Sequence, residues 1–449
     1  MRKENLLSIA RSAVEKASAV SGVGMAEAYV KKGRDIEIDV RDGKIDTIKS
    51  AEEHGIGLRV FCGSQVGFAY STTLDTDGIS DTVRRAIANA GQTEPDQYLR
   101  LPDILGPYPE VETLDAELMT RGVEEKIELA RRVEQAARAY DPRVEVIESS
   151  TYQDSVVDVA IANSKGLAFN FQGGACGVYA SLTAGEDGES QTGFALDFRL
   201  RFADLDPEEV GRQAAHRAVR MLGARQQDSR ETTLVLEPYV VVSLLGVLAP
   251  ALSGEAVQKG RSLFAGRMGE RVASDLVTIV DDGTLPGGIN SGPCDGEGVP
   301  TSRTVVIEHG VLTSFLHNTY TAAKDGLVST GNGVRGSFKG SPEVGTTNFY
   351  LSPGKTEREQ LLEELDSGLL VTEVMGMHTA NPISGDFSVG ASGLWVENGR
   401  VSHPVRGMAI AGNITDLLMK IDAVGSDLQF FGGKGAPTVR VRQMMVSGA

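Results

Sequence analysis

The segment RDIEIDVRDGKIDTIKS, residues 34–50, contains the pattern that decides the fold of the first half of the chain. Apolar and polar residues alternate on both sides of the Asp42–Gly43 pair, as in strands with one buried face. Asp-Gly favours a two-residue hairpin turn because both turn positions need positive φ. The segment therefore predicts a β-hairpin, and GIGLRVFCGSQVGFAYSTT, residues 55–73, extends it into a meander.

Helices are expected on both sides of this meander. The first is an amphipathic helix near the N-terminus, whose apolar face is formed by Leu6, Leu7, Ala10, Val14 and Ala17. The second follows the meander, with Asp75 or Asp77 as its N-cap, because a carboxylate there accepts the free amide groups of the first turn. A loop with prolines at positions 95, 102, 107 and 109 then separates this unit from the next.

A second unit of the same kind follows. It begins with a periodic helix over residues 122–140, continues with strands between residues 144 and 205, and ends with a helix opened by Asp206-Pro207. In both units a Leu-Asp pair starts the last helix, which then contains Arg85-Ala86-Ile87 or Arg217-Ala218-Val219. We interpret this as one helix–meander–helix unit used twice. The alternative is two unrelated α+β stretches with common turn chemistry.

The pattern changes after the polar segment ARQQDSRE, residues 224–231. From there, strands punctuated by glycine dominate, with hairpins expected at His309–Gly310 and Asn398–Gly399 and one clear helix over Thr356–Leu365. The sequence predicts an α+β protein. Its N-terminal helix/β-meander domain covers residues 1–225, and its β-rich C-terminal domain covers residues 226–449.

Composition limits the possible partners and compartment. The chain has 61 acidic and 44 basic residues, a net charge of −17, which disfavours direct contact with nucleic acid or anionic lipid. Three cysteines without CxxC spacing argue against a disulfide scaffold or a structural zinc site, and favour a reducing cytoplasm. The longest apolar run, Tyr239–Leu252, is shorter than the roughly 20 residues that span a bilayer. We therefore expect a cytoplasmic protein that does not contact a membrane.

The densest group of polar residues is GMHTANPISGDFSVGASGLW, residues 376–395. A catalytic interpretation makes His378 a general base oriented by Asp386, with a serine nucleophile. The alternative, which we favour because no GxSxG motif is present, is that Asn381 and Ser384 build tight turns. A substrate- or partner-contact role for His378, Asn381, Ser384 and Asp386 stays open, since binding residues concentrate on loops.

Two further motifs are weaker. Residues 280–301 contain Asp281, Asp282, Asp295 and Glu297, but not at EF-hand spacing, so we expect solvated turns there rather than a calcium site. Gly331–Gly336 matches GxGxxG without the strand before it and the helix after it that a dinucleotide site requires. We expect a glycine-rich surface loop at that position.

Several long blocks, in order, resemble the signature segments of the TldD/PmbA family, whose members have been called modulators of DNA gyrase and resemble a two-component metalloprotease. The blocks are GRSLFAGRMGERVASDLVTIVDDGTLPGG, DGEGVPT, STGNG, TTNFYLSPGK, ISGDFSVGASGLWVENG, PVRGMAIAGN and AVGSDLQF. They are dense over residues 230–449 and looser before that. The chain is identified as a member of this family by resemblance.

The family has two sister types. The TldD type resembles a zinc peptidase with an HExxxH helix and a later cysteine ligand, whereas the PmbA type, also called TldE, lacks these residues. Counting without gaps from SLFAGRMGE and from Asp427-Leu428 places those positions on Leu245, Gly246, Pro250 and Pro437. None of these side chains can bind zinc or move a proton. The chain resembles the PmbA type, with no metal or cofactor of its own and zinc expected only in a TldD-type partner.

The resemblance implies a subunit of a cytoplasmic metalloprotease complex that acts on small or unfolded peptides. The partner would be a TldD-type zinc-bearing subunit, giving a heterodimer, or a second copy, giving a homodimer. We expect the strand around Asn348 to be a sheet edge that holds peptide, and the loop from His378 to Asp386 to face the chamber or the partner. Two alternatives stay open: a self-sufficient hydrolase with its site near His378 and Asp386, and a non-catalytic homodimeric binding protein.

Overall fold

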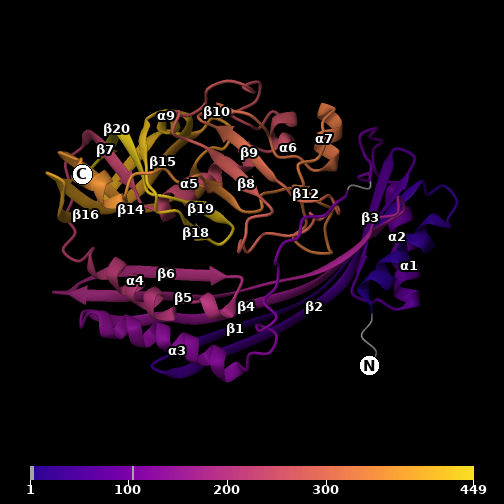
Figure 1. Ribbon diagram of the computed structural model, residues 1–449, viewed down its shortest axis with the longest axis horizontal. Coiled ribbons are helices and arrows are strands. Elements are labelled where there is room, and N and C mark those ends of the chain that lie inside the picture. The colour runs from indigo at the N-terminus through magenta and orange to yellow at the C-terminus, as the bar shows by residue number, and fades with distance from the viewer. Residues whose placement is uncertain (1–4, 104–105, 449) are drawn as a thin grey trace.

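The computed structural model describes residues 5–103 and 106–448, and it is a mixed α+β structure, as predicted (Figure 1). The first half is built on one long, curved antiparallel sheet, and the β-rich second half lies across one side of it (Figure 1). Residues 225 and 226, where we expected one domain to end and the next to begin, lie in the connection between the last helix of the first half and the first strand of the second.

The repeat predicted for the first half is present. The first unit consists of α1 (Leu6–Ser18), β1 (Met25–Arg41), β2 (Lys44–Cys62), β3 (Gln65–Ser71) and α2 (Thr76–Ala90). The second consists of α3 (Val123–Tyr140), β4 (Val144–Asn163), β5 (Ala168–Glu186), β6 (Glu189–Arg199), the short helix η1 (Phe202–Asp204) and α4 (Pro207–Val219). The sheet order β3-β2-β1-β4-β5-β6 joins the two units through β1 and β4. Helices α1 and α2 pack together at one end of the sheet, and α3 and α4 at the other (Figure 1).

Local sequence signals explain where these elements begin and turn. Asp75 is the N-cap of α2 and accepts a hydrogen bond of 2.8 Å from the Gly78 amide. Asp206 caps α4 in the same way, with proline at the first helical position. Asp42 and Gly43 have φ values of 51° and 69°, so the hairpin turn between β1 and β2 is the predicted one.

The second half contains two six-stranded sheets and a small two-stranded one. Its strands are β7 (Arg230–Leu236), β8 (Ile279–Asp282), β9 (Arg303–Glu308), β10 (Val311–Leu312), β11 (Gly333–Val334), β12 (Glu343–Val344), β13 (Phe349–Leu351), β14 (Ser367–Met375), β15 (Asp386–Glu397), β16 (Arg400–Asn413), β17 (Ile421–Val424), β18 (Gln429–Phe431), β19 (Lys434–Ala436) and β20 (Val439–Ser447). The sheet orders are β10-β9-β8-β13-β19-β18 and β16-β15-β14-β7-β20-β17. In the second of these sheets, β16 also pairs with β20, so the sheet is partly closed.

The helices of the second half are more numerous than the sequence patterns predict. They are α5 (Pro238–Ala251), α6 (Gly254–Gln258), α7 (Thr319–Asp325), α8 (Arg358–Glu363) and α9 (Ile414–Met419), with the short helix η2 (Met377–Thr379). Only α8 was clearly expected. Helix α5 contacts β14 of one sheet and β13, β18 and β19 of the other. Because it is buried between two layers, α5 is apolar nearly all round and lacks the periodicity that identifies a surface helix.

The two hairpins expected in the second half are confirmed. His309 and Gly310 have φ values of 47° and 79°, and Asn398 and Gly399 have values of 51° and 74°. These positive φ values are what a tight turn between antiparallel strands requires. Within the part of the chain that the structure describes, no helix is both long and apolar enough to cross a membrane.

Candidate functional site

Helix α5 carries Leu245, Gly246 and Pro250, the positions that the family resemblance assigns to the metal site of a zinc-bearing relative. Leu245 is 3% exposed and packs in the core, whereas Gly246 and Pro250 lie on the exposed side of the helix. Helix α5 packs against β19, and Pro437 directly follows that strand. The fold therefore brings the helix and the chain around residue 437 together, as a shared metal site would require.

The residues present do not fit zinc. Leucine, glycine and proline side chains have no lone pair for a metal and no proton for water. Across residues 5–103 and 106–448, no group of three or more His, Cys, Asp or Glu side chains is arranged to hold a metal ion. No chemical step of this chain can be routed through a metal at α5.

A groove lies where that site would be. It has a volume of about 460 Å³ and runs along the exposed side of α5, past α6, the segment after β12, the tip of the loop before β15, and β19. Its lining is dominated by small and apolar residues: Gly246, Ala249, Pro250, Ala251, Ser253, Ala256, Leu316, Val344, Gly345, Thr346, Pro382 and Ile383. Its charged residues are Glu255, Lys259, Arg261 and Lys434.

The charges of the groove are positive on balance, in a chain whose net charge is −17. Lys259 is paired with Glu255 one helical turn earlier. Arg261 is exposed and Lys434 is half-buried, and neither has a side-chain hydrogen bond or salt bridge to any residue that the structure describes. These two cations are available to an anionic ligand.

Backbone groups in the groove are available too. Pro250 has no amide hydrogen, so the Gly246 carbonyl, four residues earlier, loses its usual helical donor. Gly246 has no side chain to cover that oxygen, and a Cβ placed there would meet nothing within 4 Å. On the opposite wall, Thr346 lies between β12 and β13, and its amide, carbonyl and hydroxyl groups make no hydrogen bond to any described residue.

The loop between β14 and β15 forms the turns that we favoured. The Asn381 side chain accepts hydrogen bonds from the amides of Ile383 at 2.8 Å and Ser384 at 3.3 Å. The Ser384 hydroxyl donates to Asp386 at 2.8 Å, and the Asn413 amide group donates to Asp386 at 3.0 Å. Hydrogen bonds from Asn413 and Ser384 hold the pKa of Asp386 below its usual value. Asn381, Ser384 and Asp386 thus form one cluster, and the adjoining Pro382 and Ile383 reach the groove.

His378 is not part of that cluster. It is exposed in η2, and no hydrogen bond joins it to Asp386 among the described residues. The two oxygens of Asp386 are already engaged by Ser384 and Asn413. In this conformation Asp386 does not orient the imidazole, and a catalytic role for His378 stays a prediction.

The expectation that the strand around Asn348 is an exposed sheet edge is wrong. Asn348 is 0% exposed, and its side chain donates to the Asp282 carbonyl at 2.7 Å and to the Ser291 hydroxyl at 2.9 Å. The strand that follows it, β13, pairs with β8 on one side and β19 on the other. Its backbone groups are used within the sheet, so it cannot add a peptide strand.

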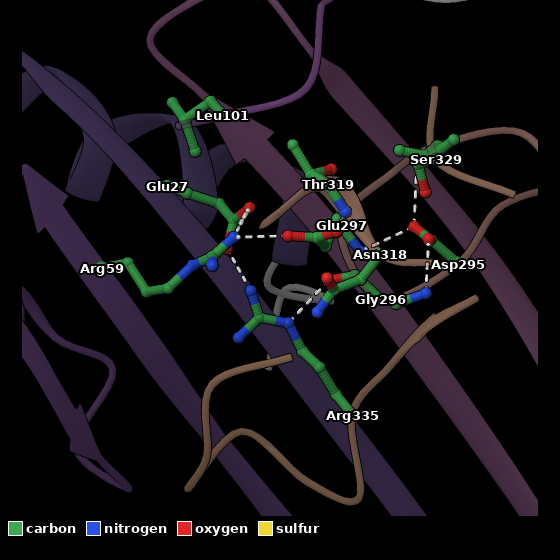
Figure 2. A network of polar contacts seen from close by, with 12 residues as sticks. Glu27, Arg59, Leu101, Asp295, Gly296, Glu297, Asn318, Thr319, Ser329 and Arg335 are labelled. Carbon is green, nitrogen blue, oxygen red and sulfur yellow. Dashed lines mark hydrogen bonds and ion pairs between the residues drawn. The ribbon is translucent and has the colours of Figure 1, made fainter. Parts of the chain in front are cut away.

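The turns expected over residues 280–301 are present, but the prediction that they are solvated is wrong, because the four acidic side chains there are buried: Asp281, Asp282, Asp295 and Glu297. Glu297 takes part in a closed network of charges with Glu27 of β1, Arg59 of β2 and Arg335 (Figure 2). Arg59 donates to both oxygens of Glu27, at 3.0 and 2.8 Å, and lies 3.4 Å from Glu297. Arg335 donates to Glu27 and, at 2.6 Å, to the Gly296 carbonyl.

This network joins the two halves of the chain, since Glu27 and Arg59 belong to the first sheet and Glu297 and Arg335 to loops of the second half (Figure 2). Asp295 lies beside it and accepts backbone amides from Glu297, Val299 and Gly333. Burial, followed by the negative charge of Glu297, raises the pKa of Asp295 to about 8. The partners Glu27 and Arg335 are 308 residues apart, so no local pattern in the sequence could indicate the pairing.

Comparison with known proteins agrees with this architecture. Three domain models of PmbA/TldA metallopeptidases match the chain: domain 1 at residues 26–90, the central domain at 120–222 and the C-terminal domain at 229–448. The metalloprotease PmbA of Escherichia coli O157:H7 is 30% identical over 427 residues, which cover 94% of this chain and 92% of that one. A metalloprotease of Methanothermobacter thermautotrophicus is 29% identical over 95% of this chain and 96% of its own.

Solved structures show the same likeness. TldE from Thermococcus kodakarensis superposes with a TM-score of 0.89 at 26% identity, covering 98% of this chain and 99% of that one. A Thermotoga maritima protein described as a candidate modulator of a DNA gyrase gives a TM-score of 0.88 at 32% identity, covering 94% of this chain and 96% of its own. The chain belongs to the PmbA/TldD family of metallopeptidases.

Proposed function

We propose that this chain is a PmbA/TldE-type subunit of a peptidase complex whose zinc is held by a TldD-type sister subunit. The observation that carries the proposal is helix α5. The resemblance assigns the metal site to this helix, which lies beside β19, and its residues Leu245, Gly246 and Pro250 offer no metal ligand. The likeness to TldE of Thermococcus kodakarensis supports the same assignment.

In this proposal the substrates are small or unfolded peptides. The groove along α5 supports a peptide ligand, because its walls are lined with small and apolar side chains and the backbone groups of Thr346 make no hydrogen bond to any described residue. The chain supplies peptide-contacting surface, and the sister supplies the metal. The complex is a cytoplasmic heterodimer with the zinc-bearing subunit; a homodimer is the competing assembly.

Co-expression with the HExxxH-containing sister from the same genome tests the proposal. We expect the two chains to copurify, and the pair to cleave an unfolded peptide in a reaction that a zinc chelator abolishes. Each chain purified alone is the control, and this chain alone should be inactive. The proposal fails if the chains do not associate, or if this chain alone cleaves peptide in the presence of chelator and loses that activity in the His378→Ala variant.

A further inference from the structure

The groove along α5 has more than an apolar lining, because two cations, one from a strand and one from a loop, also line it. Lys434 is a half-buried residue of β19, and Arg261 lies in the segment after α6. Neither has a carboxylate partner in the part of the chain that the structure describes, whereas Lys259 at the same groove is neutralised by Glu255. A half-buried ammonium group without a counter-ion gains stability when an anion binds beside it.

The backbone groups at the groove complement these cations. An oxyanion can accept hydrogen bonds from the Thr346 amide and hydroxyl, and the Thr346 carbonyl can accept one from a peptide amide. A terminal carboxylate followed by peptide amides needs this combination of positive charge, donors and acceptors. A simple anion would leave the backbone acceptor of the groove without a hydrogen bond, and an uncharged peptide would leave Arg261 and Lys434 without a counter-ion.

We propose that this groove binds the C-terminal carboxylate of a peptide, with Lys434 and Arg261 holding the carboxylate and the backbone at Thr346 pairing with the residues before it. The inference rests on the proposed function only for the choice of a peptide as ligand. It assigns to this chain a recognition site for free C-terminal ends.

Charge and size limit the competing ligands. A polyanion such as nucleic acid would meet the repulsion of a net charge of −17, whereas a single carboxylate meets chiefly the local cations. The apolar wall at Ala249, Leu316, Val344 and Ile383 favours small apolar side chains near the terminus. The ligand is therefore a peptide end rather than a phosphate-rich chain.

Isothermal titration calorimetry on the isolated full-length chain tests the inference, with three probes. These are N-acetyl-trialanine with a free carboxylate, the C-terminal amide of the same peptide, and N-acetyl-Ala-Glu-Ala amide, in which the only carboxylate is a side chain. We expect the free acid to bind about tenfold or more tightly than either amide. Equal binding of the free acid and its amide overturns the proposal. Equal binding of the free acid and the glutamate peptide overturns the assignment to a chain terminus.

Matched variants locate the site. In Lys434→Gln the affinity for the free acid should fall nearly to the affinity for its amide. The preference for the free acid should persist in the control variant Lys31→Gln. Lys31 lies in β1 of the first sheet and, like Lys434, it is half-buried and has no salt bridge to any described residue. Gly246→Leu places a side chain in open space on α5 and should abolish binding of the free acid. Retention of the preference in folded Lys434→Gln protein overturns the proposal.

Two measurements keep the test independent of folding and of the proposed function. If Lys434→Gln does not fold, as judged by circular dichroism, Arg261→Gln in an exposed segment takes its place with the same expectation. The titrations contain no sister subunit, so an inactive complex leaves their outcome unchanged. Conversely, if the unaltered chain shows no preference for the free acid, this inference is overturned, while an active, chelator-sensitive complex still supports the proposed function.

Discussion

The groove along α5 and the buried network around Glu27 use the same kinds of side chain in opposite ways. In the network, Arg59 lies between Glu27 and Glu297, Arg335 pairs with Glu27, and almost no water reaches either arginine. In the groove, Arg261 and Lys434 lie at an open surface without carboxylate partners in the described structure. A cation that is paired and buried holds the two halves of the chain together, and one that is unpaired and open is available to a ligand.

We therefore expect substitutions in the network to lower stability and substitutions of the groove cations to weaken ligand binding. Removing one member of a buried set of charges leaves an uncompensated charge in a medium of low dielectric constant, which costs several kcal/mol. Removing an exposed, unpaired cation costs almost nothing in stability. Four experiments test how the network and the groove differ.

The largest effect is expected for Arg335→Met. This change leaves Glu27 and Glu297 with Arg59 alone and deprives the Gly296 carbonyl of its donor. We expect the free energy of unfolding to fall by about 3–5 kcal/mol. Urea denaturation measures it, with Arg84→Met as the control, because that arginine has an 81% exposed side chain and an expected cost below about 0.5 kcal/mol. Equal losses in the two variants would contradict the role of the network.

The second effect is a pH dependence that originates in the network. The pKa of Asp295 is raised to about 8 in the folded protein and is about 4 in an unfolded chain. Between those values the folded state holds a proton that the unfolded state has released, so stability must fall as pH rises through this window. We expect the Tm to decrease from pH 6 to pH 9 and the decrease to be smaller in Asp295→Asn. If the Tm decreased equally with pH in both proteins, or rose with pH in the unaltered protein, Asp295 would not be a neutral carboxyl in the folded state.

The third effect compares two helical glycines. Gly246 in α5 faces the open groove, so Gly246→Ala should raise the free energy of unfolding by about 0.5–1 kcal/mol through helix propensity. Gly211 in α4 packs against α3, where a new Cβ would lie 2.9 Å from the Ala136 Cβ and closer still to the Val133 carbonyl. Gly211→Ala should therefore lower stability by about 1–3 kcal/mol. Changes of the same sign in the two variants would show that the groove is not open at Gly246.

The smallest effect is expected at the groove cation itself. Lys434→Gln should change the free energy of unfolding by less than about 0.5 kcal/mol, because no described carboxylate depends on this lysine. Urea denaturation beside Arg335→Met gives the comparison directly. A loss of more than about 2 kcal/mol would place Lys434 among the structural charges instead.

The fold of the first half could be predicted because its signals are local. The Asp42–Gly43 turn, the caps at Asp75 and Asp206 and the helical periodicity of residues 123–140 all act within a few residues, and the structure contains each of them. Helix α5 could not be identified as firmly from its pattern, because a helix buried between two sheets has no polar face.

The candidate site was only partly predictable. The count to Leu245, Gly246 and Pro250 leads to helix α5, along which the groove runs, and the turn chemistry of Asn381 and Ser384 leads to the loop that reaches this groove. Lys434 and Thr346 carry no motif, and they matter only because β19 and the segment after β12 fold beside α5. The burial of Glu297 and Asp281 could not be predicted, because Arg59, which pairs with Glu297, and Asn332, which binds Asp281, are 238 and 51 residues away in the sequence.

The central claim is that this chain works in a zinc peptidase without holding zinc. The most direct measurement is the metal content, by mass spectrometry, of the chain purified alone and of the chain copurified with its HExxxH-containing sister. The account predicts no stoichiometric zinc in the chain alone, and zinc together with chelator-sensitive peptidase activity in the pair. A tightly bound, stoichiometric zinc in the isolated chain would contradict it.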